Sequence, residues 1–300
     1  MKYFLPILIF LITSCKHITK ENDNSEISVA VLRGPSALAF AEWADNPPVI
    51  DGDTFHIRWI DSPEIMQSLL IKQEVDIAVL PMINAANLYN KNLPYHLSGC
   101  PIWGTLYAVS RDSLKAPVYV FGRGTTPEIL AKQSLADFKD EDFKFTFSSA
   151  GELTQALLSG RVNSAVLSEP FISIAMNKDK SLEIVADLNC RKDKSSYGFP
   201  QTAIVCHKEL SNKREIIDSL LTISCNSTAK FPEKAIKTLE KEKVFAKNTL
   251  DSNSVMRCRI SYKPASQIKD EVNSFLKLIY KYEPKALGSK MPDNKFFIEE

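Results

Sequence analysis

The sequence predicts an α/β protein made of two doubly wound lobes around a cleft, joined by two crossovers. Two pairs of segments support this fold, because each pair repeats the same order of elements along the chain. At 29–36 and 118–126, a buried strand passes through a tight turn with arginine and glycine into a helix. At 75–80 and 162–167, a buried strand is entered from a helix. The loops after the strands of such lobes line the cleft between them.

The first copy of this unit is expected to contain three strands and two helices. The predicted strands lie at 27–32, 55–60 and 75–80. The first helix is expected to begin at Ser36. Asp61 or Ser62 caps the second helix, which has Pro63 in its first turn.

The second copy repeats the series. Its strands are predicted at 118–121, 143–147 and 164–167. A helix is expected from Thr125 or Thr126, with a proline in its first turn. Ser149 and Glu152 are expected to form a capping box for the next helix, which ends at Gly160.

The rest of the chain is expected to return to the first lobe. An apolar, β-prone stretch precedes a proline-containing break at 115–117, where the first crossing is placed. A return strand is predicted at 202–207, followed by helices at 216–221, 232–241 and 267–282. Lobe I is therefore assigned to 27–110 and 203–300, and lobe II to 111–202.

Residues 1–15 are expected to be a lipoprotein signal peptide rather than part of the fold. Lys2 provides a positive start, and the apolar stretch after it is too short to span a bilayer as a mature helix. It ends in Ile-Thr-Ser-Cys at 12–15, which resembles the bacterial lipobox and implies cleavage before Cys15 and lipidation of that cysteine. The alternative is an ordinary secretory signal that contains a cysteine. Polar residues at 16–26 are expected to form a flexible tether.

Composition argues against several classes of function. A net charge of +1 gives no electrostatic footprint for nucleic acid. The cysteines beyond Cys15 are scattered and form no paired motif, so neither zinc nor a disulfide scaffold is indicated. One or two disulfides remain open, but burial as small apolar groups is the expected role. The isolated histidines have no ligand-like spacing, so no metal and no cofactor are expected. No nucleophile–base arrangement stands out, so no catalytic residue is named.

Motifs in a fixed order along the chain point to a family. They lie at 75–91, 103–107, 122–127, 168–171 and 283–293. In this order they resemble the substrate-binding lipoproteins of ABC importers with the type II periplasmic-binding fold, and most closely the sulfonate and thiamine-pyrimidine group. Gln73 and Ser289 depart from the family pattern, because both stand where a glycine is common.

Loops after the strands supply the residues predicted to bind a ligand. They are Arg33, Gly34, Pro35, Ser36, Pro81, Met82, Asn84, Arg123, Gly124, Thr125, Thr126, Glu169 and Pro170. The turns at 34–36 and 124–126 place small or hydroxyl residues where a strand becomes a helix, so free N–H groups can bind an anion or polar group. Simple helix capping explains the same residues without a ligand.

The charges at the cleft leave the ligand undefined. Arg33 and Arg123 occupy equivalent places and could clamp a carboxylate or sulfonate, or stand solvated in their loops. Glu169 would suit an amine or a protonated pyrimidine unless it pairs with Arg123, and a nitrogen heterocycle is slightly favoured. Trp43, Trp103 and Tyr107 are expected in the core rather than stacked on a ligand.

The resemblance implies a lipid-anchored, extracytoplasmic solute-binding protein that is not an enzyme. It would deliver a small organic molecule to an ABC permease and its ATPase, as a monomer anchored at the cell membrane. Its lobes are expected to close at crossings near 109–115 and 199–202. The alternatives are a fold-related enzyme of the pyrimidine-synthase or menaquinone-pathway type, and a surface lipoprotein that uses the scaffold for protein contact. Export argues against the enzymes, whose substrates are cytoplasmic.

Overall fold

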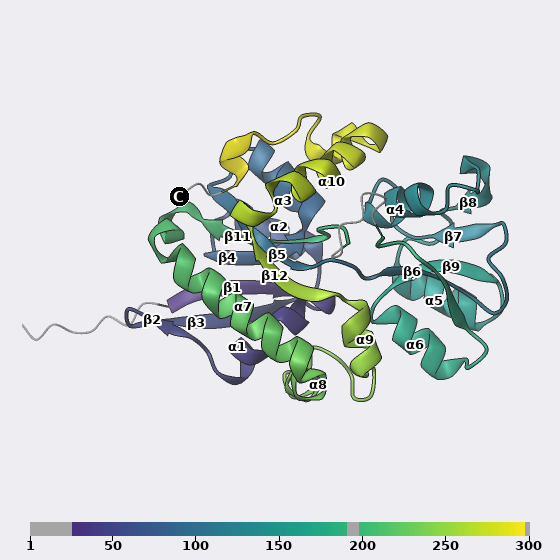
Figure 1. The fold of residues 1–300 in the computed structure, drawn as a ribbon, viewed down its shortest axis with the longest axis horizontal. Helices are drawn as coiled ribbons and strands as arrows, with labels where there is room; N and C mark the ends of the chain where they lie inside the picture. Colours follow the sequence, from purple (N-terminus) through teal and green to yellow (C-terminus); the bar gives the residue numbers. More distant parts are fainter. Residues whose placement is uncertain (1–25, 191–197, 298–300) are drawn as a thin grey trace, which may run out of the picture.

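A computed structural model describes residues 26–190 and 198–297, and it contains two lobes side by side (Figure 1). One lobe is built on a seven-stranded sheet and the other on a five-stranded sheet. The predicted signal peptide and lipobox lie outside the described residues. The predicted α/β fold with two lobes is confirmed.

The seven-stranded sheet has the order β12-β5-β11-β4-β1-β3-β2. Its strands are β1 (Glu26–Leu32), β2 (Val49–Ile50), β3 (Asp53–Ile60), β4 (Ile77–Pro81), β5 (Tyr95–Ile102), β11 (Thr202–His207) and β12 (Ile260–Pro264). β1 runs parallel to both β3 and β4, as expected for a doubly wound unit. β11 pairs antiparallel with β4 on one side and β5 on the other.

The five-stranded sheet repeats this arrangement with the order β10-β6-β9-β7-β8. Its strands are β6 (Leu106–Ser110), β7 (Val118–Val120), β8 (Phe143–Lys144), β9 (Ser164–Ser168) and β10 (Glu183–Asp187). β7 runs parallel to both β8 and β9, while β6 pairs antiparallel with β9 and β10. The order β5-β11-β4-β1-β3 therefore matches β10-β6-β9-β7-β8 strand for strand. The two copies predicted from the sequence are a structural repeat.

Helices cover the sheets of both lobes (Figure 1). They are α1 (Ala41–Asp45), α2 (Pro63–Ile71), α3 (Met82–Asn90), α4 (Thr126–Ser134), α5 (Ala150–Leu158), α6 (Phe171–Lys178), α7 (Arg214–Lys230), α8 (Pro232–Lys241), α9 (Ser252–Arg257) and α10 (Lys269–Tyr282). The helix expected from Ser36 begins as a 3-10 helix at Pro35–Phe40, which leads directly into α1. None of the helices in the described part of the chain is long and apolar enough to cross a membrane.

Caps identified in the sequence begin α2 and α5. The Ser62 Oγ accepts a hydrogen bond from the Ile65 N–H at 3.3 Å, which identifies Ser62 rather than Asp61 as the N-cap. The Ser149 Oγ accepts one from the Glu152 N–H at 3.2 Å. The Glu152 carboxylate, however, accepts from the N–H and hydroxyl of Ser148 rather than from the Ser149 N–H. The second half of the expected capping box is therefore made with the residue before the N-cap.

The first change of sheet comes earlier than the break at 115–117. β5 belongs to the seven-stranded sheet and β6 already belongs to the five-stranded sheet, so the chain crosses at 103–105. Residues 106–110, assigned to lobe I from the sequence, pair with lobe II instead. The second crossing lies between β10 and β11, close to the predicted return strand.

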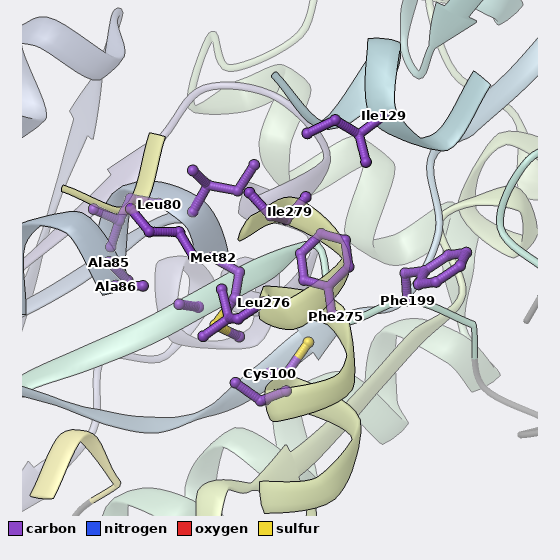
Figure 2. Packing of buried hydrophobic residues seen from close by; sticks show 14 of the residues in the cluster. Leu80, Met82, Ala85, Ala86, Cys100, Ile129, Phe199, Phe275, Leu276 and Ile279 are labelled. Carbon is purple, nitrogen blue, oxygen red and sulfur yellow. The ribbon is translucent and has the colours of Figure 1, made fainter. Parts of the chain in front are cut away.

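A large hydrophobic core joins the lobes on one side of the molecule. Ile129 on α4 lies toward Phe275 and Ile279 on α10, and Met82 packs in the same cluster (Figure 2). The expected core residues Trp43, Trp103 and Tyr107 are buried, and so are four of the five described cysteines. All five described cysteines are unpaired thiols, with Cys190 exposed.

Candidate functional site

A cavity of about 730 Å³ lies between the lobes, at the carboxyl ends of the parallel strands. Predicted site residues in its wall are Arg33, Pro35, Ser36, Pro81, Asn84, Gly124, Thr125, Thr126 and Glu169. Residues from both copies of the repeat therefore face one space. This position is where doubly wound sheets bind their ligands.

Lobe I presents the starts of successive helices to the cavity. The 3-10 helix after β1 contributes Pro35 and Ser36, and α2 contributes Pro63 and Glu64. The turn between β4 and α3 contributes Pro81 and α3 itself contributes Asn84. Each helix begins directly after a parallel strand, so the positive ends of these helices face the same space.

Lobe II presents the start of α4. Gly124 has φ 75°, a left-handed conformation that favours glycine, and its N–H donates to the Glu128 carboxylate at 2.6 Å. The Thr125 hydroxyl donates to the Gly122 carbonyl oxygen and does not cap α4, although Thr125 is the N-cap residue. Thr125 and Thr126 still line the cavity, together with Ser148 before α5.

The two equivalent arginines do not form a clamp. The Arg33 Nε lies 2.7 Å from the Asp61 carboxylate, and its other end donates to the Lys243 carbonyl oxygen at 2.6 Å. The Arg123 guanidinium lies over the Phe145 ring, 5.5 Å from the centroid, and is not among the cavity residues. The repeat thus places the arginines equivalently in sequence but gives them different partners.

Glu169 borders the cavity and pairs with Arg257, not with Arg123. The Arg257 Nε lies 2.5 Å from one carboxylate oxygen, and the Ser173 hydroxyl donates to the other at 2.8 Å. The Glu169 side chain is only 1% exposed. Burial raises the pKa of Glu169 above its usual value, although the Arg257 charge and the Ser173 hydrogen bonds act in the opposite direction.

Other predicted residues lie apart from the cavity wall. Met82 is fully buried and points into the core cluster, because the first turn of α3 directs it toward the sheet (Figure 2). Gly34 and Pro170 stand beside wall residues but do not line the cavity. The described residues contain no group of three or more His, Cys, Asp or Glu side chains that could hold a metal ion.

The sequence interpretation missed many wall residues. They include Gln67, Asn87, Thr105, Phe121, Ser148, Ser168, Gln201, Thr202 and Lys285. Thr105 and Gln201 lie at the two crossings between the lobes, and this position could have identified them as cavity residues. Lys285 lies in the tail motif at 283–293, and the neighbouring Ala286 carbonyl accepts from the Asn87 amide at 3.0 Å.

One buried amide ties the two crossings together behind the cavity. The Asn189 Oδ1 accepts from the Thr105 N–H at 3.0 Å, the Leu106 N–H at 3.1 Å and the Gln201 amide at 2.8 Å. Its Nδ2 donates to the Leu106 carbonyl oxygen at 2.8 Å. A Cβ on Gly104 would lie 2.8 Å from the Asn189 Cγ, so only glycine allows this close approach.

Comparison with known proteins gives the family. An ABC transporter protein from Parabacteroides distasonis is 50% identical, with a TM-score of 0.89, over 93% of this chain and 100% of its own. The periplasmic aliphatic sulphonate binding protein SsuA from Escherichia coli is 14% identical, with a TM-score of 0.70, over 92% of each chain. The periplasmic nitrate-binding protein NrtA from Synechocystis is 10% identical, with a TM-score of 0.58, over 89% of this chain and 85% of its own.

The 14% and 10% neighbours show the fold, and the 50% relative shows kinship along the chain. No family model matches, and no curated protein does. Two α/β lobes with a cavity at their facing strand ends are the architecture of the type II periplasmic-binding fold. The chain belongs to the substrate-binding proteins of ABC transporters with the type II periplasmic-binding fold, as its motifs predicted.

Proposed function

We propose that this chain is a lipid-anchored, extracytoplasmic solute-binding protein that delivers a small organic molecule to an ABC permease and its ATPase. It acts as a monomer and releases the solute without changing it chemically. The observation that carries the proposal is the cavity of about 730 Å³, walled by equivalent loops of two lobes. The 50% identity to an ABC transporter protein supports the transport role.

The wall suits a small polar ligand held by neutral donors. Hydroxyl and amide side chains dominate its polar part, among them Ser36, Asn84, Thr126 and Gln201. An exposed helix N-terminus contributes about 0.3–1 kcal/mol, and about 2 kcal/mol when partly buried. Micromolar affinity needs about 8 kcal/mol, so helix ends alone fall short. Closure of the lobes, which excludes water from these hydrogen bonds, supplies the remainder.

Thermal unfolding across a panel of metabolites tests the solute-binding part. One ligand class should raise the midpoint of the chain, since a ligand bound only by the folded state stabilises it by mass action. The matched control is Ser148→Trp, which places a bulky ring at an exposed position of the cavity wall. If a ligand raises the unfolding midpoint of Ser148→Trp as much as that of the parent chain, it binds outside this cavity. Mass spectrometry of the recovered compound completes the test, because a chemically altered ligand would indicate an enzyme.

Cys15→Ala tests the anchor. The variant should appear in the soluble extracytoplasmic fraction, while the parent chain stays with the membrane and incorporates labelled fatty acid. Several acyl chains on one cysteine anchor stably, because each buried CH₂ contributes about 0.8 kcal/mol. A processed alanine variant that still sediments with membranes would rule out this anchor.

A further inference from the structure

A segment from lobe I supplies the charge partner of a lobe II residue. α9 lies between the lobes (Figure 1), and its last residue, Arg257, reaches Glu169 across 88 positions of sequence. The same guanidinium donates to the Ser173 hydroxyl at 2.9 Å. The Ser254 hydroxyl, one turn earlier on α9, lies 2.6 Å from that of Ser173. α9 is therefore bonded to Glu169 and to α6 of lobe II through several polar contacts.

The two charges have unequal access to the cavity. Glu169 borders it together with Ser168 and Thr105, whereas Arg257 is not among the wall residues. Both side chains are largely buried, with 1% of Glu169 and 19% of Arg257 exposed. A buried carboxylate without a cation is costly and would oppose an anionic ligand. With Arg257 in contact, the pair contributes no net charge to this side of the cavity.

The other charged residues of the wall do not neutralise Glu169 in place of Arg257. Arg33 is held by Asp61, and Glu64 and Lys285 come from opposite ends of the lobe I chain. The charged wall residues Arg33, Glu64, Glu169 and Lys285 sum to zero, and the sum stays zero when the partners Asp61 and Arg257 are counted with them.

Resting on the solute-binding function above, we propose that Arg257 is a specificity-determining residue. Its guanidinium cancels the charge of Glu169 in the cavity wall, so that the cavity takes an uncharged or anionic ligand rather than a cation. Arg257 acts through Glu169 and is a positioning residue, not one that touches the ligand.

The charge of the cavity can be measured without knowing the ligand. Ser168→Cys places a thiol in the wall next to Glu169. The background is the full chain with Cys15→Ala and Cys190→Ser, in which the remaining cysteines are buried. The thiol is treated with sulfonatoethyl methanethiosulfonate, an anion, and with trimethylammonioethyl methanethiosulfonate, a cation. The ratio of the two reaction rates reports the local potential, and the background without Ser168→Cys gives the correction for other thiols.

Glu169→Gln keeps the shape of the side chain and leaves Arg257 unopposed. The anion-to-cation ratio should rise on the order of tenfold, given the size of a unit-charge interaction near a protein surface. Adding Arg257→Met should return the ratio to about the parent value, whereas adding Arg257→Lys should keep it raised. Circular dichroism of each variant establishes that it is folded. If Glu169→Gln does not fold, Arg257→Met alone gives the reverse comparison, because it leaves the Glu169 charge unopposed and should lower the anion-to-cation ratio.

A purely structural role for the pair predicts a different result. Both rates would then change together and the ratio would stay within about twofold of the parent, which would overturn the proposal. The outcome is separable from that of the solute-binding proposal. If the anion-to-cation ratio shifts but no metabolite stabilises the chain, only the solute-binding proposal is contradicted. If a metabolite stabilises the chain but the ratio does not change, only the proposed role of Arg257 is contradicted.

Discussion

Asn189→Ala should destabilise the protein strongly, because it removes the amide that joins the two crossings. Asn189 is fully buried, and its side chain makes hydrogen bonds to Thr105, Leu106, Gln201 and Asp187. After truncation, the Thr105 and Leu106 N–H groups lose their acceptor. The Leu106 carbonyl oxygen keeps one partner, the Leu188 N–H at 3.2 Å.

The magnitude follows from the groups left without partners. A buried donor without an acceptor costs about 1–3 kcal/mol. Two backbone N–H groups therefore give a loss of about 2–6 kcal/mol. The Gln201 amide is not counted, because it borders the cavity and can turn to water. Asn189→Asp should also destabilise, because it loses the donor to Leu106 and places a second carboxylate beside Asp187.

Urea unfolding followed by circular dichroism measures the loss. Asn163→Ala, which changes an exposed asparagine, is the matched control and should stay within about 0.5 kcal/mol of the parent chain. A loss of less than about 1 kcal/mol for Asn189→Ala would show that water replaces the amide at the crossings and would refute the reasoning.

Other changes test the caps and the cavity loop. Thr125→Ala with Thr126→Ala should weaken ligand binding measured by calorimetry by about tenfold, the value of one to two hydrogen bonds, with little change in stability because the Thr125 hydroxyl does not cap α4. Ser62→Ala should cost about 1 kcal/mol in urea unfolding, since it removes a cap that α2 uses. Burial opposes a lowered pKa for Asp251, but the hydrogen bonds from Ser254 outweigh it and keep the pKa below its usual value. The stabilisation by the Asp251 carboxylate is therefore complete above the unfolded pKa of about 3.9 and is lost as the pH falls through the folded pKa. Asp251→Asn should flatten the acid side of the stability profile, and an unchanged profile would contradict this assignment.

Strands and helices whose own residues carry a clear apolar pattern were predictable from the local sequence. Strands β1, β4, β9 and β11 appear within a few residues of their predicted bounds. α8 has the predicted bounds, because Pro232 begins it and its apolar face is periodic. Gln73 and Ser289, which stand where glycine is common, have φ 54° and 61°. Both residues therefore adopt the left-handed conformation that glycine adopts more readily.

β5 escaped prediction because its burial comes from tertiary structure. The segment contains His96, Ser98, Gly99 and Pro101, which give neither an apolar run nor an alternating pattern. It is nevertheless buried, since β11 and β12 pair on its two sides. Gly99 is needed there, because a Cβ would lie 2.5 Å from the Lys263 carbonyl oxygen. Partners that arrive from distant parts of the chain leave no local signal.

The same limit explains why helix ends in the site were predictable and its charges were not. A helix N-terminus is local, so the turns at 34–36 and 124–126 could be located from sequence. A count of charges by loop, however, treats Arg33 as a free cation and Glu169 as a free acid. Both residues are held by one distant segment, Arg33 through the Lys243 carbonyl oxygen and Glu169 through Arg257. The contacts of both charged residues are therefore made by a chain segment that is not part of the cavity wall, and the preference for a nitrogen heterocycle stays a prediction.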